Sequence, residues 1–130
     1  PLRKIASGGE VSRVMLACKV VLGESDVCDT LVFDEVDAGV GGATAVALAE
    51  VLAQLAKTHQ VIVVTHLPQV AVMASKQYVV SKTEEYNALP VTSLTEVSGT
   101  QREEEIARML SGSITEASLA HAHELLSEVR

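Results

Sequence analysis

The chain has 130 residues, of which 48% are hydrophobic and 21% are charged, a balance typical of a globular domain with its own core and not of a disordered segment. Its formal net charge of −7 argues against a sequence-independent nucleic-acid surface, because neutralising phosphates requires clustered Lys and Arg. No apolar run reaches the roughly 18–20 residues of a membrane span and no secretory leader is recognisable, so we expect a cytoplasmic protein.

The two cysteines and the first residues of the chain lead to two further expectations. Cys18 and Cys28 form neither a CxxC pair nor a cluster with histidine, so we expect reduced thiols, with Cys18 in the core. The chain starts at Pro1 without an initiator Met, and the residues that follow resemble the interior of a longer sequence. We therefore expect a fragment.

The first predicted element is an amphipathic helix that opens on Ser7, Gly8, Gly9 and Glu10. Its apolar residues recur at three- and four-residue spacing: Val11, Val14, Met15, Cys18, Val21 and Leu22. Ser7 is a candidate N-cap with Glu10 completing a capping box, and Gly23 is a candidate C′ residue. The alternative is an anion site, because a helix N-terminus offers free N–H groups and glycines leave room for a phosphate. Both interpretations stay open on this stretch alone.

A short buried strand is predicted at residues 31–33, and it ends in Asp34 and Glu35, with Asp37 close behind. Because such an apolar run fits a parallel sheet, we expect both faces of this strand to be covered. Carboxylates at the end of a strand suit Mg²⁺, which prefers oxygen ligands. The alternative is a strand that runs into an acidic turn.

A helix is predicted at residues 43–57 and a second buried strand at residues 61–65, directly before His66. Strand, helix and strand form a βαβ unit with parallel strands and a right-handed connection. The carboxyl ends of parallel strands lie on one edge of the sheet, so we expect Asp34, Glu35 and His66 to gather in one crevice.

The rest of the chain is predicted to hold a short helix at 67–74, strands at 77–82 and 91–97 that pair antiparallel at the margin of the sheet, and helices at 101–110 and 116–129. Thr100 and Glu103 form a candidate capping box for the first of these last two helices. His121 and His123 are two residues apart on a helix and point to different sides, so we expect surface residues and no metal pair. We expect Arg13 to be a solvated charge, and the alternative is a contact with nucleotide or with a partner acid.

Taken in order, these parts resemble the C-terminal half of the ATPase head of SMC-like ATP-binding-cassette ATPases, and among them the bacterial members that act in DNA double-strand-break repair and recombination. The resemblance rests on LRKIASGGE at residues 2–10, FDEVDAG at 33–39 and THLPQVA at 65–71, and RMLSG at 108–112 extends it. It implies that residues 1–130 form one α/β lobe of a P-loop ATPase head, with a mostly parallel sheet flanked by helices and an antiparallel marginal hairpin.

The resemblance also implies roles toward two nucleotides. Asp34 matches the Walker B acid that supports Mg²⁺ through water, Glu35 the general base that polarises the attacking water, and His66 the switch histidine that hydrogen-bonds the γ-phosphate. These three serve the nucleotide of their own subunit.

Other residues match positions that face the opposite subunit. Ser7, Gly8 and Gly9, with Glu10, match the signature motif, which binds the γ-phosphate of ATP held by the partner. Asp37 falls in the D-loop, which crosses the interface of a head-to-head homodimer.

The sequence departs from the family pattern in one important way, because it contains no G-x-x-x-x-G-K-[ST] loop. The family carries that loop in an N-terminal Walker A lobe, joined to this half by an antiparallel coiled coil. We therefore expect ATP and Mg²⁺ to bind only with that lobe, DNA contacts to come from other parts of the protein, and the fragment alone to be inactive. The alternatives are a non-catalytic interaction module with an ATPase-like fold, and a metal-dependent phosphohydrolase using Asp34, Glu35, Asp37 and His66.

Overall fold

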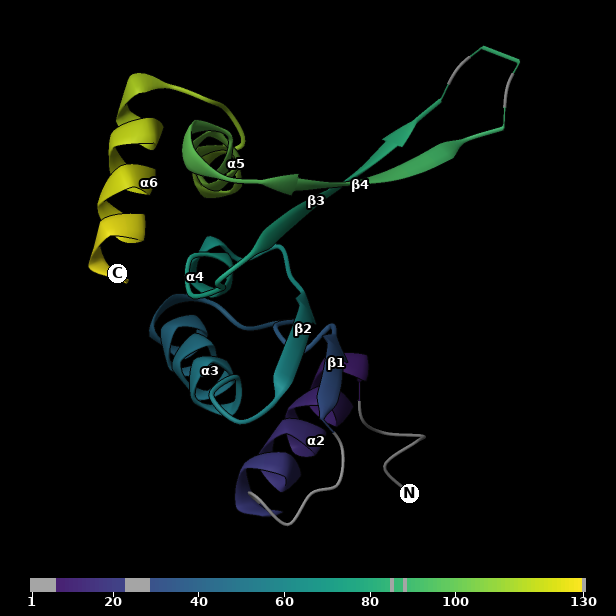
Figure 1. Ribbon diagram of the computed structural model, residues 1–130, viewed down its shortest axis with the longest axis vertical. Coiled ribbons are helices and arrows are strands. Elements are labelled where there is room, and N and C mark those ends of the chain that lie inside the picture. The colour runs from purple at the N-terminus through teal and green to yellow at the C-terminus, as the bar shows by residue number, and fades with distance from the viewer. Residues whose placement is uncertain (1–6, 23–28, 85, 88, 130) are drawn as a thin grey trace. The chain divides into compact units, whose positions relative to one another are not determined.

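The computed structural model describes residues 7–22, 29–84, 86–87 and 89–129. These residues belong to two compact units, one ending at Met73 and the other beginning at Ala74. The first unit contains α2 (Gly8–Leu22), β1 (Thr30–Asp34), α3 (Gly42–Leu55), β2 (Gln60–Val64) and α4 (Pro68–Ala71) (Figure 1). The second contains β3 (Gln77–Thr83), β4 (Val91–Val97), α5 (Gly99–Ser111) and α6 (Glu116–Glu128). No helix within the described ranges is long and apolar enough to cross a membrane.

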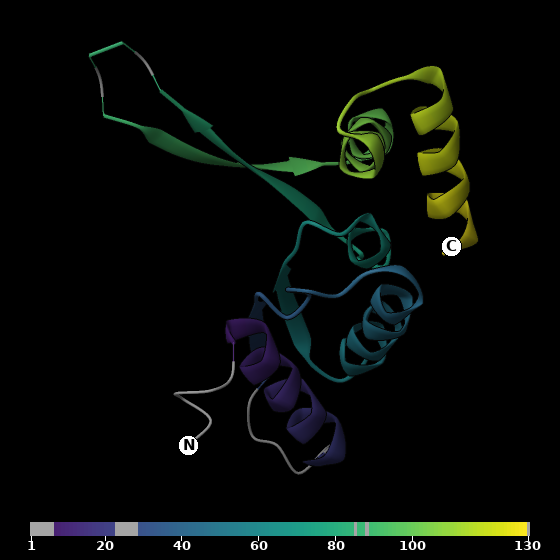
Figure 2. The same ribbon diagram turned by 180° about the vertical axis from the view of Figure 1, so that it is seen from behind.

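The first unit is built on a parallel pair of strands. β1 and β2 pair in register from Thr30 beside Gln60 to Asp34 beside Val64, and α3 connects them. The predicted strand, helix and strand are therefore present, with both strands running in the same direction, as Figures 1 and 2 show from opposite sides. Among the described residues this sheet has only these two strands.

The core of the first unit lies on one face of this sheet. Its buried members come from β1, the turn after it and the three helices: Leu16, Leu31, Phe33, Val36, Leu48, Ala49, Leu52, Leu55 and Val70. Val61 and Val63 of β2 are partly buried and pack against this cluster. Phe33 is only 2% exposed. The α3 residues recur at three- and four-residue spacing, so a single stripe of that helix covers the strands.

The other face of the sheet has no covering layer among the described residues, which corrects the expectation that both faces of the first strand are buried. β1 alternates between exposed and buried residues, and Val32 is 63% exposed. Ile62, its register partner on β2, is 46% exposed, and Val64 on the same face is 55% exposed. We call Val32, Ile62 and Val64 the open sheet face. The strand is apolar on both sides, but only one side has a covering layer within the described residues.

The first helix begins as predicted but packs by a different side. The Glu10 N–H donates to Ser7 Oγ at 3.2 Å, so Ser7 is the N-cap. The buried residues of α2 are Gly9 and Leu16, whereas the apolar stripe that we expected to be buried is exposed: Val11, Val14, Met15, Cys18, Val21 and Leu22. The predicted core position of Cys18 is therefore wrong, because the most apolar stripe of the helix is not the one facing β1. Gly23 and Cys28 lie outside the described residues.

In the second unit, β3 and β4 form an antiparallel pair, from Gln77 beside Val97 to Thr83 beside Val91. The hairpin was predicted at the margin of the first sheet, but it forms a separate two-stranded sheet. The reason is that both strands direct their hydrogen bonds to each other. The alternation of apolar and polar residues is typical of a half-exposed strand, but it does not specify which sheet that strand joins.

The two C-terminal helices pack on each other through Ile106, Ala107, Ser118 and Ala122. The capping box predicted at Thr100 is wrong, because α5 begins at Gly99 after the N-cap Ser98, so that Thr100 lies within the first turn.

The remaining features of α5 and α6 are their caps and an exposed histidine. Gly112 ends α5 with a φ of 76°, which only glycine adopts readily, and Thr115 caps α6 through a reciprocal box with Ser118. His123 is exposed, with Nδ1 2.9 Å from Glu103 Oε1.

Substitutions of two neighbouring residues of β1 test whether the core lies on only one face of the sheet. We expect Phe33→Ala to lower the free energy of unfolding by about 3–5 kcal/mol, because it opens a cavity beside Leu31 and Leu48. Val32→Ala should change it by less than about 1 kcal/mol in the 130-residue chain, since this side chain is already in water. Urea denaturation followed by circular dichroism measures both. Equal losses would show that the second face is covered.

Candidate functional site

The carboxyl ends of β1 and β2 lie on one edge of the sheet, and polar side chains follow both. Asp34 and Glu35 end β1 and are exposed, and the His66 side chain that follows β2 is 73% exposed. Because the pairing register sets Asp34 beside Val64, two residues before His66, the edge presents two carboxylates and an imidazole to solvent. The parallel register confirms that both strands end on this edge, and the gathering of the three side chains in one crevice stays a prediction.

Glu35 has an unusual backbone. Its φ is 59°, in the left-handed region, which costs a residue with a side chain about 1–2 kcal/mol. Two backbone bonds close the turn behind it, from the Ala38 N–H to the Glu35 carbonyl at 3.1 Å and from the Val40 N–H to the Asp37 carbonyl at 3.0 Å. Strained backbone is concentrated at functional sites, so its position here singles out Glu35.

Asp37 connects the ends of the two strands. Its side chain is buried and accepts hydrogen bonds from the Thr65 hydroxyl and, at 3.3 Å, from the His66 backbone N–H. His66 Nδ1 lies 3.5 Å from the same carboxylate oxygen, and Thr65 Oγ1 in turn accepts from the Leu67 N–H at 3.0 Å. Asp37 therefore holds the segment that carries His66. Sequence reasoning missed Thr65, whose only signal was a hydroxyl directly before a histidine at a strand end.

The start of α2 lies against the Glu35 turn. A Cβ added to Gly9 would come within 2.7 Å of Ala38 Cβ and 2.9 Å of the Glu35 carbonyl oxygen, and a Cβ on Gly8 would overlap the Glu35 carboxylate. That carboxylate thus lies at a helix N-terminus, where free N–H groups and the positive end of the helix dipole favour an anion. Both glycines allow this close approach.

Two polar side chains of α2 fasten the helix to the same turn. Ser12 Oγ donates to the Asp34 carbonyl at 2.7 Å, and Arg13 Nη1 donates to the carbonyls of Val36 at 3.1 Å and Ala38 at 2.8 Å. The expectation that Arg13 is a solvated charge is therefore wrong. A signal was present, because Arg13 lies four residues after Gly9 and shares its helix face.

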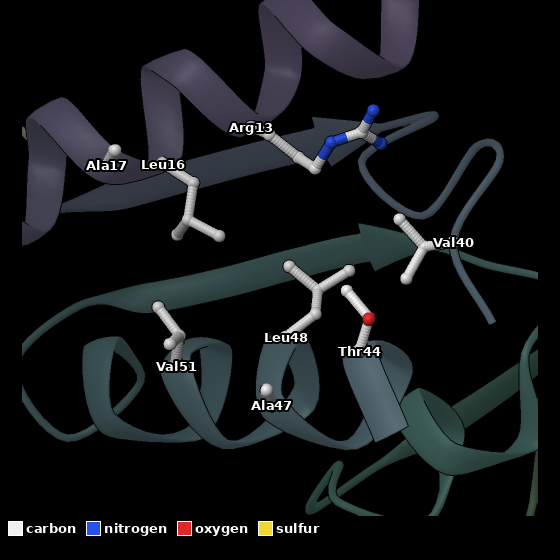
Figure 3. A pocket seen from close by; sticks show the side chains of 8 residues that line it. All are labelled: Arg13, Leu16, Ala17, Val40, Thr44, Ala47, Leu48 and Val51. Carbon is white, nitrogen blue, oxygen red and sulfur yellow. The ribbon is translucent and has the colours of Figure 1, made fainter. Parts of the chain in front are cut away.

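An open groove of about 260 Å³ lies between α2 and α3, and Figure 3 shows the side chains that line it: Arg13, Leu16, Ala17, Val40, Thr44, Ala47, Leu48 and Val51. Arg13 is its only charged member, and most of the wall is hydrocarbon. Such a wall offers few partners for phosphates, so the polar edge of the sheet is the better candidate for chemistry.

The edge also limits the metal chemistry that this chain can support alone. No cluster of three or more His, Cys, Asp or Glu side chains able to hold a metal ion occurs among the described residues. Asp34 offers one exposed carboxylate, which fits Mg²⁺ held mainly by water and phosphate oxygens. Asp37 is buried and already bonded, so the four residues of the phosphohydrolase alternative do not form a shared metal cage.

Comparison with known proteins identifies relatives of the whole chain. No family model matches. The DNA repair protein RecN of Deinococcus radiodurans is 54% identical over 127 residues, covering 98% of this chain and 22% of that protein. RecN of Mycobacterium leprae is 53% identical over 131 residues, covering 100% of this chain and 22% of that protein. The whole chain is similar in sequence to these RecN proteins. It spans about a fifth of the length of these curated relatives.

A solved structure has a similar fold. It comes from work on the ATP-driven dimerisation and DNA-stimulated activation of SMC ATPases, and it matches with a TM-score of 0.54 over 98% of this chain and 63% of its own chain. The sequences are 22% identical, so the likeness shows the fold alone. The predicted α/β fold of the ATPase type is confirmed at this level, and a larger parallel sheet stays a prediction.

The contact of Gly9 with the Glu35 turn gives a test with a matched control. We expect Gly9→Ala to destabilise the chain by about 1–3 kcal/mol, because the new methyl meets backbone and a methyl group, neither of which yields easily. Gly41→Ala adds the same atom where nothing lies within 4 Å, and it should cost less than about 1 kcal/mol. Urea denaturation of both variants gives the comparison. Equal effects would mean that the helix does not pack tightly on the turn.

Proposed function

We propose that this chain is the C-terminal lobe of the ATPase head of a RecN-type, SMC-like protein that binds and hydrolyses ATP in DNA double-strand-break repair and recombination. The observation that carries the proposal is the gathering of Asp34, Glu35 and His66 at one sheet edge, beside the start of α2. The names of the curated relatives support the repair role, and the SMC-ATPase fold supports the nucleotide chemistry.

Three residues act on the nucleotide of their own subunit. Asp34 supports Mg²⁺ through water, and the ion supplies charge neutralisation for the phosphates. Glu35 orients and polarises the attacking water. His66 hydrogen-bonds the γ-phosphate, with Asp37 fixing the segment that carries it. Phosphoryl transfer requires chiefly positioning and electrostatic stabilisation, and these groups supply both.

The start of α2 acts on the nucleotide of the opposite subunit. Ser7 accepts the Glu10 N–H with one lone pair, and a hydroxyl also carries one proton that it can donate to a phosphate oxygen. Gly8, Gly9 and Glu10 complete this signature turn. Two heads therefore dimerise around two ATP molecules, with Asp37 and its D-loop at the interface.

The remaining parts of the head lie in the longer protein. The P-loop comes from an N-terminal Walker A lobe, since the 130 residues contain none. The open sheet face is the surface on which that lobe packs, because no layer within the described ranges covers its apolar residues. DNA is bound by other parts of the protein.

Removing the base tests the proposal in the full-length protein. We expect Glu35→Gln to lower kcat for ATP hydrolysis by about 100-fold or more, because the water loses its proton acceptor, while the Kd for ATP stays within about threefold. Glu104→Gln, an exposed α5 glutamate, is the matched control and should leave both values unchanged. Malachite-green phosphate release and filter binding measure them. Wild-type turnover in Glu35→Gln would refute the base assignment, and a wild-type protein without turnover would favour the interaction module.

The open sheet face makes a separate prediction about assembly. When this chain and the upstream segment are expressed as two polypeptides, Ile62→Asp should weaken their co-purification by about tenfold or more, because a carboxylate would be buried without a partner. Val80→Asp on β3 places the same group on an exposed valine of the second unit, 65% exposed against 46% for Ile62, and it should have little effect. Undiminished assembly of Ile62→Asp would exclude this face as the docking surface.

A further inference from the structure

We propose that Arg13 is a positioning residue that holds the strained Glu35 turn against the start of α2, so that the proposed base and the Ser7 turn move as one unit. The proposal rests on the assignment of Glu35 and Ser7 to ATP chemistry. It adds a residue that none of the family motifs assigns, together with a mechanical link between the two halves of the composite site.

The first step is the reach of one side chain across two elements. Arg13 projects from α2 toward the carboxyl end of β1, as Figure 3 shows, and its Nη1 donates to the carbonyls of Val36 and Ala38. These carbonyls flank Asp37, so one guanidinium nitrogen holds the turn on both sides of that residue. A bond from a charged donor is stronger than one between neutral groups.

The second step is that the Glu35 turn needs contacts from outside the turn to keep its conformation. Glu35 keeps a φ of 59°, and such conformations persist only where the surroundings over-determine them. Inside the turn there are the backbone bonds that Ala38 and Val40 donate. The hold from outside comes from two sides. From α2 it comes through the bonds that Ser12 and Arg13 donate, and from the segment after β2 through the bonds that Asp37 accepts.

The third step is the short path between the two nucleotide-facing groups. Ser7 caps the helix that carries Arg13, and the Gly9 position leaves no room between that helix and the Glu35 carbonyl. A displacement of the helix start by a phosphate at Ser7 is therefore transmitted to the backbone of Glu35. The state of one nucleotide site biases the base that serves the other.

Amide hydrogen exchange of the full-length protein tests, independently of catalysis, whether Arg13 stabilises the Glu35 turn. In Arg13→Ala we expect exchange at the Ala38 and Val40 amides to accelerate about tenfold or more, because the turn opens locally. The Gly112 amide, bonded to the Arg108 carbonyl in the second unit, is the internal reference and should not change. Arg108→Ala removes an exposed arginine, paired with Glu105, and should leave the Ala38 and Val40 amides protected. Unchanged protection in Arg13→Ala would overturn the proposal.

Kinetic measurements test whether the contacts of Arg13 affect ATP hydrolysis through Glu35. We expect Arg13→Ala to lower kcat about tenfold at an unchanged number of ATP sites, because misplacing a reacting group by a fraction of an ångström has effects of this size. Arg13→Lys, which keeps a charged donor on a shorter stem, should recover part of the rate. Ser12→Ala, which removes a neighbouring bond, should lower kcat by a smaller factor.

A double-mutant cycle separates positioning from general loss of structure. In the Glu35→Gln background, Arg13→Ala should have no further effect on the residual single-turnover rate, because the group that it positions is gone. A further tenfold loss would mean that Arg13 acts elsewhere, and faster exchange with a normal kcat would mean that the hold does not reach the base. If the wild-type protein hydrolyses no ATP, the proposed function fails, and the exchange measurement still decides the hold.

Discussion

The contact on which the site depends is the approach of the α2 start to the turn after β1. Gly9 allows the helix to touch the Glu35 carbonyl and the Ala38 side chain, and a Cβ at this position would overlap both. Ser12 and Arg13 then fasten the same helix to the carbonyls on either side of the acids. A glycine pair that the sequence associates with phosphate binding thus has a second, mechanical role within its own chain.

A second constraint acts from the neighbouring strand. Asp37 is buried beneath the edge and bonded to Thr65 and to the His66 backbone, so the turn after β1 also fixes the segment after β2. Leaving a buried carboxylate without donors costs more than a typical hydrogen bond contributes, which makes these contacts mutually dependent. The exposed Asp34, Glu35 and His66 are therefore carried by backbone that is held from α2 on one side and from β2 on the other.

Two apolar surfaces of the first unit stay exposed, the open sheet face and the apolar stripe of α2. Both lie on elements that also carry site residues. In a chain that spans about a fifth of its relatives' length, such surfaces are where the rest of the protein is expected to pack. The candidate site and these two exposed surfaces share the same short strands and helix.

The sequence by itself determined the order and type of most elements, the N-cap at Ser7, and the meeting of both strand ends on one edge. Each of these depends on residues near in sequence or on the general rule that parallel strands end on one edge. Only the tertiary structure decided which side of α2 is buried, that one face of β1 is open among the described residues, that the hairpin forms its own sheet, and that Arg13 and Thr65 support the site. The contacts of Arg13 and Thr65 join residues more than 20 positions apart, and periodicity identifies an apolar stripe without identifying its partner.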